Sequence, residues 1–403
     1  MKKKQVAPDL LSEQELEQGT KPKKKKQNIF IRVLAMLVTV ALVLGSLFLV
    51  MNWDEYNLDA IKRRLALRSV QTSASGEGEP FTHGGGNSIS LTCLSDGILT
   101  TSTTGTHYYT FSGQQYTERV QTMEYPALVA SRTSGVTYDA GGQSLQVYTG
   151  GEEHFSLKLE GDGDLLSARI NEDGWLAVTA QESGYKGAVT VYNSEYQRVF
   201  RLNRSSTFVV DAMVSPDCKS VAVITMGQQN GRFESSLLVY RLDREDPVAQ
   251  ISLGNLAALE LDYEKDTIWI LCESELAAVS TSDWSVTDYS FGNRYLKGCS
   301  LGGNGFALLL FGGYRAGSAD EAVSISPQGE ELGGMDIQGQ LLSFDAAGNY
   351  LGLLAGGSLK LYTSQMDLYR TLEDVQGARY VALAENASAV LADRQQAWMY
   401  VPD

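Results

Sequence analysis

The segment FVVDAMVSPDCKSVAVITM, residues 208–226, contains two apolar runs separated by the polar turn SPDC. Each run is apolar almost throughout, which is typical of a strand packed on both faces. Pro216 and Asp217 favour a tight turn, and Cys218 stands where glycine would be expected. We therefore predict a β-hairpin with Cys218 in a left-handed backbone conformation. Asp217, Cys218 and Lys219 are then turn residues and not an activated thiol site.

Similar hairpins recur along residues 89–402, each followed by an alternating third strand and a more polar fourth strand. Asn or Asp with Gly, as in LSDG at 94–97 and NEDG at 171–174, marks the turn of each hairpin. The repeat length, about 40 residues for four strands, is that of a propeller blade. The units begin near Ile89, Ala127, Leu165, Phe208, Ala257, Leu296, Gln340 and Arg379. These units predict an all-β fold, a single β-propeller over residues 81–403 with eight blades, or seven if one unit is miscounted.

The last unit has only three strands before the chain ends at Asp403. A ring of blades needs its edges closed, so another segment must supply the fourth strand. EPFTH, residues 79–83, precedes the first unit and is the natural donor. We expect the two ends of the propeller to share the last blade.

An apolar stretch near the N-terminus predicts one transmembrane helix within residues 29–53. Residues 33–51 carry no charge, and 19 residues at 1.5 Å per residue span a bilayer core. The lysine-rich tail, residues 1–28, includes KPKKKK and is expected to stay in the cytoplasm by the positive-inside rule. The alternative is a cleaved signal peptide. The expected location is therefore the cell membrane, with a single-pass signal anchor and the propeller outside.

Residues 54–80 are expected to join the anchor to the propeller. NWDEYNLDAIKRRLALRSV, residues 52–70, has helical spacing of apolar residues and predicts a stalk helix or a surface-lying amphipathic helix. TSASGEGEP, residues 72–80, is small and polar, which predicts a flexible linker.

Charge is distributed unevenly along the chain. The formal charge is −15, and residues 1–32 carry nine Lys or Arg against four acids, so the rest of the chain carries −20. An acidic body excludes the basic footprint that nucleic-acid binding requires. The tail is explained by topology and by attraction to anionic lipid.

Few residues suggest catalysis or metal binding. The three histidines, His83, His107 and His154, fall on or beside outer or third strands of different blades and are not expected to converge. The four cysteines form no C-x-x-C pair, although Cys272 and Cys299 lie in neighbouring blades and could pair. EGDGDLL, residues 160–166, lacks the spacing of a calcium loop. We expect no metal and no cofactor.

The recurring strand, SPDG-like turn and apolar strand resemble WD-repeat-like and quinoprotein-like propellers. Together with the lysine-rich tail and single span, the chain is similar to an uncharacterised family of membrane-anchored propellers in Gram-positive, clostridia-type bacteria. The G-H and W-D marks of true WD repeats and a per-blade tryptophan pattern are missing. The resemblance implies a fold and a location but transfers no catalytic residue.

One set of residues is a candidate binding face. Propellers usually bind ligands at the connections from the fourth strand of one blade to the first strand of the next. Arg and Tyr are favoured anchors of such surfaces, and basic residues in an acidic domain attract anionic ligands. The residues expected around this mouth are Tyr125, Arg204, Arg294, Tyr295, Arg379 and Tyr380.

Two hypotheses for the function follow. The first is a non-catalytic binding or scaffold module for an envelope protein, peptide or glycan. The second is a propeller enzyme, hydrolase or redox, with its site in the central funnel. Ionisable residues that meet in the funnel with perturbed pKa values would favour the enzyme. The missing acid–base or metal set favours binding, and the partner and the oligomeric state are not defined by the sequence.

Overall fold

We analysed a computed structural model of the chain, which divides into two units, residues 1–57 and 58–403. The structure describes residues 33–34, 36–40, 42–43, 58–86, 88–161, 163–229, 231–375 and 377–402. In the first unit, the described residues are helical. The tail expected at residues 1–28 lies outside the described residues, as does most of the expected anchor. Within the described ranges, no helix has both the length and the apolar composition needed to cross a membrane.

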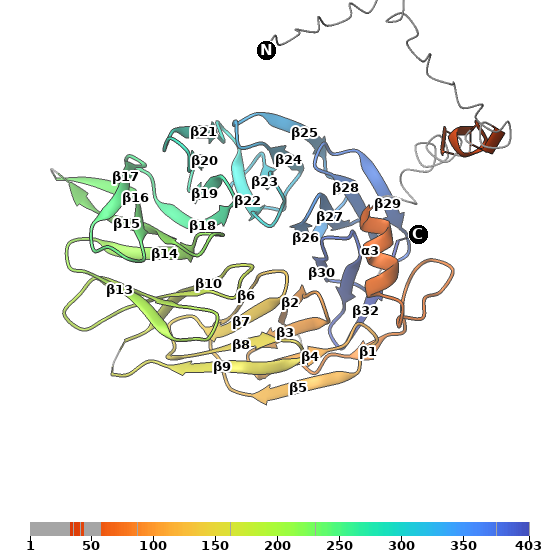
Figure 1. Cartoon of the computed structure of the whole chain (residues 1–403), viewed down its shortest axis with the longest axis horizontal. Helices are drawn as coiled ribbons and strands as arrows, with labels where there is room; N and C mark the ends of the chain where they lie inside the picture. The colour runs from red at the N-terminus through yellow and green to blue at the C-terminus, as the bar shows by residue number, and fades with distance from the viewer. Residues whose placement is uncertain are drawn as a thin grey trace, which may run out of the picture. The chain divides into compact units, whose positions relative to one another are not determined.

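The second unit is an eight-bladed β-propeller (Figure 1). It contains eight antiparallel sheets of four strands, and in each sheet the strands follow one another in a meander. The prediction of eight blades is confirmed, and the alternative of seven is wrong. Every predicted blade start lies within one residue of the observed first strand, because Asn, Asp and Gly in the turns fix the register of each hairpin.

The first four blades form one half of the ring. Blade 1 contains β2 (Ile89–Cys93), β3 (Ile98–Ser102), β4 (Gly105–Tyr109) and β5 (Gln115–Val120). Blade 2 contains β6 (Pro126–Ala130), β7 (Ser134–Asp139), β8 (Ser144–Thr149) and β9 (Glu152–Lys158). Blade 3 contains β10 (Leu165–Ile170), β11 (Leu176–Ala180), β12 (Gly187–Tyr192) and β13 (Arg198–Arg204). Blade 4 contains β14 (Phe208–Val214), β15 (Ser220–Gln229), β16 (Arg232–Arg241) and β17 (Pro247–Ser252).

The other four blades complete the ring. Blade 5 contains β18 (Ala258–Glu264), β19 (Thr267–Cys272), β20 (Glu275–Ser280) and β21 (Val286–Ser290). Blade 6 contains β22 (Tyr295–Ser300), β23 (Ala307–Gly312), β24 (Glu321–Ile325) and β25 (Glu331–Asp336). Blade 7 contains β26 (Leu341–Ala347), β27 (Tyr350–Ala355), β28 (Ser358–Thr363) and β29 (Leu368–Leu372). Blade 8 contains β30 (Tyr380–Leu383), β31 (Ala389–Ala392), β32 (Gln396–Tyr400) and β1 (Phe81–Thr82).

Blade 8 closes the ring with strands from both ends of the propeller. The outer strand β1 pairs antiparallel with β32, with Phe81 opposite Ala397 and Thr82 opposite Gln396. The ring of Phe81 packs against Tyr109 of blade 1, with ring centroids 5.0 Å apart. The predicted strand exchange through residues 79–83 is therefore confirmed.

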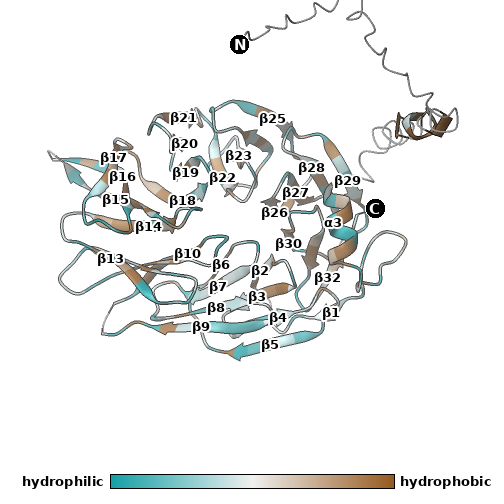
Figure 2. Ribbon diagram, viewed as in Figure 1, coloured by the Kyte–Doolittle hydropathy of each residue, from teal (hydrophilic) through white to brown (hydrophobic). Residues whose placement is uncertain are grey.

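Burial follows the position of each strand in its blade. The second strands are buried almost throughout, as in β11 and β23, because sheets pack against them on both faces. The fourth strands alternate between exposed and half-buried residues, as in β5 and β9. Figure 2 shows these two outer strands mostly in teal, the colour of hydrophilic residues. The core is thus a series of apolar layers between adjacent blades.

The segment before the ring is packed on the propeller and does not form a free stalk. The helix α3 (Leu58–Ala66) buries Ala60 and Arg63, and Leu67 directly after it is also buried. The Nη1 of Arg63 donates to the carbonyl of Asn386 at 2.7 Å, and Figure 1 shows α3 beside blade 7. Both apolar contacts and the hydrogen bond of Arg63 thus hold α3 on the propeller.

Residues 72–80 differ from the expected flexible linker. Gly78 donates its N–H to Met399 at 2.8 Å, and Val401 donates to Gly76 at 2.8 Å. Backbone hydrogen bonds with the C-terminal strand hold this segment, because the small residues let it lie close to that strand. The compact unit therefore begins at Leu58 and not at residue 81.

The turn SPDC has the backbone that the sequence predicted. Cys218 has a φ of 57°, in the left-handed region where only glycine is free of strain. Its Sγ lies 3.3 Å from Nδ2 of Asn171 and 3.6 Å from Oδ2 of Asp173. Burial raises the pKa of the Cys218 thiol, so the thiol is not activated. All four cysteines are free, so the possible pairing of Cys272 with Cys299 is not formed.

The variant Cys218→Gly should leave the protein as stable as the wild type or more stable by up to about 1 kcal/mol. The substitution relieves the left-handed strain. Urea denaturation followed by tryptophan fluorescence measures the difference. The control Cys218→Ala keeps the Cβ and should show no gain. A marked loss in the glycine variant would show that the sulfur contacts stabilise the turn more than the strain destabilises it.

Candidate binding face

The connectivity of each blade defines two faces of the ring. The connections from fourth to first strands and from second to third strands lie on one face, here called the upper face. The turns between first and second strands and between third and fourth strands lie on the opposite, lower face. This division follows from the antiparallel order of strands in every sheet. Figure 1 shows the first strands surrounding the axis of the ring.

Large apolar side chains are exposed on the upper face where first strands begin. Tyr125 immediately precedes β6, and the others are the first or second residues of β14, β18, β22 and β26. We call this set the upper ring; its exposed fractions are Tyr125 62%, Phe208 54%, Leu259 49%, Tyr295 45% and Leu342 43%. Five exposed apolar side chains around one axis form a surface that partner proteins commonly cover.

Five of the first strands share a β-bulge that places one extra residue near the upper face. The bulged residues are Leu166, Val210, Leu259, Lys297 and Leu342. Four of them are aliphatic, and only Lys297 of blade 6 carries a charge. A bulge commonly redirects a side chain at a functional site. Lys297 is therefore the one cation of this set, beside the aliphatic Leu342 of blade 7.

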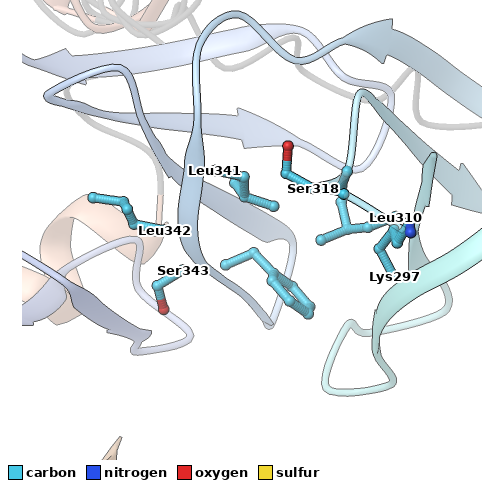
Figure 3. A pocket seen from close by; sticks show the side chains of 9 residues that line it. Lys297, Leu310, Ser318, Leu341, Leu342 and Ser343 are labelled. Atoms are coloured by element: carbon cyan, nitrogen blue, oxygen red, sulfur yellow. The ribbon is translucent and has the colours of Figure 1, made fainter. Parts of the chain in front are cut away.

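A pocket of about 340 Å³ lies at the junction of blades 6 and 7. Figure 3 shows Leu341 of blade 7 pointing toward Leu310 of blade 6, while Leu342 and Ser343 point away from blade 6. Ser318 and Ala319, from the loop between β23 and β24, complete the upper side, and Phe344 forms one wall. Because this loop joins a second strand to a third strand, the pocket opens on the upper face. The sequence did not predict this pocket. In the structure, Lys297 is the one charged residue among the five bulged positions.

The structure places the predicted binding residues in the connections on the upper face. Tyr125 and Tyr295 belong to the upper ring, and the side chain of Arg379 is exposed. Tyr380 is half-buried and packs in the apolar layer between blades 8 and 1. Its ring is therefore less accessible than those of the other two tyrosines.

The two other predicted arginines have partners within the propeller. Arg294 donates to Glu321 at 3.2 Å and to the hydroxyl of Tyr289 at 2.6 Å, and it lies 4.2 Å from the centroid of Phe311. Arg204 donates from Nε to Thr207 at 3.3 Å. These contacts make Arg294 part of the packing of blade 6. Its role in binding a ligand stays a prediction.

Charged residues meet around the axis below the upper face. Nη2 of Arg169 in β10 lies 2.9 Å from Asp211 of β14 and 3.3 Å from Glu260 of β18. The contact with Glu260 joins blade 3 to blade 5, so the side chains meet on the inner side of blade 4. Asp211 is almost completely buried and also accepts a hydrogen bond from the hydroxyl of Ser167.

The buried carboxylates of Asp211 and Asp345 link neighbouring blades. Asp211 accepts the N–H of Leu261 in the next blade at 3.2 Å. Asp345 likewise accepts the N–H of Leu383 at 2.8 Å. These N–H groups lie on the inner edges of the sheets and have no partner strand. The two carboxylates are therefore needed to satisfy backbone groups.

The pKa values around the axis show which groups could exchange protons near neutrality. Burial raises the pKa of Asp262 to about 7 and that of Asp345 to about 6. Burial also raises the pKa of Cys93 to about 12 and that of Cys299 above its usual range, so neither thiol is a nucleophile at neutral pH.

Ion pairs join the turns of three blades on the lower face. Nε of Arg132 in blade 2 lies 3.5 Å from Glu172 of blade 3 and 3.9 Å from Glu385 of blade 8. The pairs bring together turns between first and second strands on both sides of blade 1. A ligand on the axis would therefore meet charged side chains before it reached the lower face.

His83 and His107 lie together at the ring closure, contrary to the expectation that the histidines do not converge. Nδ1 of His83 accepts the N–H of Gly85 at 3.1 Å, and the backbone at Gly84 lies against the imidazole of His107. Burial lowers the pKa of His107, Glu118 opposes this effect, and His83 adds to it. Among the described residues, which leave out Asp162 of the acidic loop, no three metal-ligating side chains cluster.

Comparisons with known proteins agree with this fold. The model of a family described as "Family of unknown function (DUF5711)" matches residues 77–365, more than half of the chain. No curated protein matches. Similar solved structures include the C-terminal WD40 domain of Sif2 (TM-score 0.55, 11% identity, covering 80% of this chain and 95% of that chain) and the Dos1 propeller (0.54, 11%, 80% and 95%). The computationally designed Ika8 protein is also similar (0.56, 12%, 80% and 99%), and at such identities the likeness shows the fold alone.

The variant Asp211→Ala should lower the free energy of unfolding by about 3 kcal/mol, because it leaves Arg169 with Glu260 alone and the N–H of Leu261 without its acceptor. Urea denaturation measures the loss. The matched control is Asp243→Ala, whose carboxylate pairs with Arg241 at 2.9 Å on the exposed surface. This variant should change stability by less than about 0.5 kcal/mol. Equal small losses in both variants would contradict the linking role of Asp211.

Stability should depend on pH through His107. Because the pKa of His107 is lower in the folded state than in the unfolded chain, its contribution is complete above pH 6.5 and is lost as the pH falls below 6.5. Between pH 7 and pH 5, the unfolding free energy of the wild type should fall further than that of His107→Gln. Asp262 and Asp345 act in the opposite direction in both proteins, so the difference isolates His107. Identical pH profiles would contradict this assignment.

Proposed function

The chain belongs to the DUF5711 family, a family of unknown function, and we propose that it is a membrane-anchored binding or scaffold module. Its propeller would stand outside the cytoplasmic membrane and bind an envelope protein or peptide. The observation that carries this proposal is the upper ring, five exposed apolar side chains that surround the axis on one face. Structures with related folds are consistent with a binding role, but the site comes from this chain alone.

The sequence of the N-terminal segment supports the anchor. Residues 33–51 are long and apolar enough for one span, and KPKKKK lies just before them. The resemblance of the sequence to membrane-anchored propellers of Gram-positive bacteria is part of the argument for this proposed anchor. A helix of this length would hold the propeller at the cell surface.

A catalytic propeller is the second candidate, and Asp262 is the observation that favours it. Its pKa of about 7 suits a general acid or base. Binding explains more of the site, because Asp211 and Asp345 accept backbone N–H groups and the nearby thiols are protonated. Nothing else around the axis supplies an activated nucleophile among the described residues.

Partner capture in intact cells tests the binding proposal. A photoreactive phenylalanine analogue replaces Tyr314, which is 81% exposed in the upper-face loop between β23 and β24. Light should join the full-length protein to one partner, identified by mass spectrometry. Replacing Tyr125 and Leu259 with serine together should reduce this product at least tenfold, because two apolar anchors of the interface are lost.

The matched control replaces Leu368 and Val286 with serine. Both are exposed apolar residues of outer strands, away from the upper ring. This double variant should keep the crosslinked product. The proposal is wrong if the upper-ring variant captures the same partner at the wild-type level, or if both double variants lose it equally.

A further inference from the structure

We infer that the pocket between blades 6 and 7 binds the C-terminal residue of a partner polypeptide, with its free carboxylate on Lys297 and its apolar side chain against Phe344. The inference rests on the proposed function, because it names the chemistry of the partner that the upper face would hold. Three features of the pocket carry it: a cation without an acidic partner, an apolar wall and the hydroxyl group of Ser318.

The cation is Lys297, which has no acidic partner. Its Nζ donates to the carbonyl of Arg315 at 2.9 Å, which leaves two N–H groups for an anion. In the described part of the chain, Lys297 forms no ion pair, and the neighbouring Glu321 is bound by Arg294. An anionic ligand would therefore gain a charge-assisted hydrogen bond without displacing a carboxylate.

The backbone of β23 is shaped around this lysine. A Cβ on Gly312 would lie 2.6 Å from Cε of Lys297 and 3.0 Å from the carbonyl oxygen of Ser318. The glycine thus leaves room for the stem of the lysine to lie along the strand, with its ammonium at the carbonyl of Arg315 in the upper-face loop beside the pocket. Lys297 is the only charged residue among the five bulged positions.

The apolar wall lies beside the cation. Leu310, Leu341, Leu342 and Phe344 line the pocket. Phe344 of blade 7 can approach blade 6 because Gly298 has no side chain, and any Cβ there would collide with its ring. A volume of about 340 Å³ is at the lower end for small-molecule pockets, so it suits a group about the size of one terminal residue.

One hydroxyl group, that of Ser318, can complete the anion site. The Oγ of Ser343 points to blade 8 instead, where it accepts the N–H of Val381 at 3.1 Å. Ser318 is exposed at the upper side of the pocket (Figure 3). A terminal residue presents a carboxylate and an apolar side chain on one carbon. Internal Asp or Glu lacks the adjacent apolar group, so the C-terminus fits this pocket better.

Binding of peptides with free or blocked C-termini tests the inference. The full-length protein, purified in dodecyl maltoside, is applied to an array of random octapeptides synthesised with free carboxylates and, in parallel, as carboxamides. The bound peptides should be enriched in Leu, Ile or Phe at the last position. Amidation should weaken the best peptide at least tenfold in fluorescence anisotropy, because it removes the charge that Lys297 recognises.

Variants of Lys297 separate this site from the rest of the face. Lys297→Met should weaken the best peptide at least tenfold, and Lys297→Arg should retain more of the affinity. The matched control is Lys265→Met, an exposed lysine in the lower-face turn between β18 and β19. This variant should bind as the wild type does.

Three results would overturn the inference. The first is equal affinity for the free and amidated forms, and the second is full binding by Lys297→Met. The third is competition by octanoate with no preference for any terminal residue, which would make the pocket a fatty-acid site. If one of these occurs while the serine variant at Tyr125 and Leu259 still loses its partner in cells, the proposed function stands and only the terminal-residue inference fails.

Discussion

The ring depends on hydrogen bonds that satisfy the inner edges of its sheets. The first strand of each blade has one neighbour, so part of its N–H groups face the axis without a partner strand. Side chains of adjacent blades accept these groups: Asp211 accepts Leu261, Ser343 accepts Val381, and Asp345 accepts Leu383. Unsatisfied buried N–H groups would cost about 1–3 kcal/mol each. The same side chains also link each blade to the next one.

This requirement explains why charged residues gather around the axis of the ring. A carboxylate that accepts backbone N–H groups needs burial and fixed geometry, which are also features of active sites. The raised pKa of Asp345 therefore fits a structural role, that of accepting a backbone N–H group, as well as a catalytic role. The surface that remains available is the upper face, where apolar residues and one lysine begin the first strands.

The repeat was readable from the sequence because its signals are local. Turn chemistry at Asp217 and Cys218, and the apolar strands beside it, depend on residues close in the chain, and they placed the blades to within one residue. The docking of α3 and the pocket at Lys297 depend on contacts between distant segments. Arg63 looked like one of several surface charges, although it binds the carbonyl of Asn386. No local pattern distinguishes such an arginine from its exposed neighbours.

The shared last blade also imposes an order on folding. The strand β1 is synthesised before all others in the ring, and its partner β32 is among the last. Blades 1 to 7 can form as hairpins while the chain emerges, but they make an open arc with an unpaired apolar layer at each end. Such layers and strand edges are prone to wrong association until the ring closes. Loss of the last few residues would thus leave a long-lived arc in place of a slightly smaller propeller.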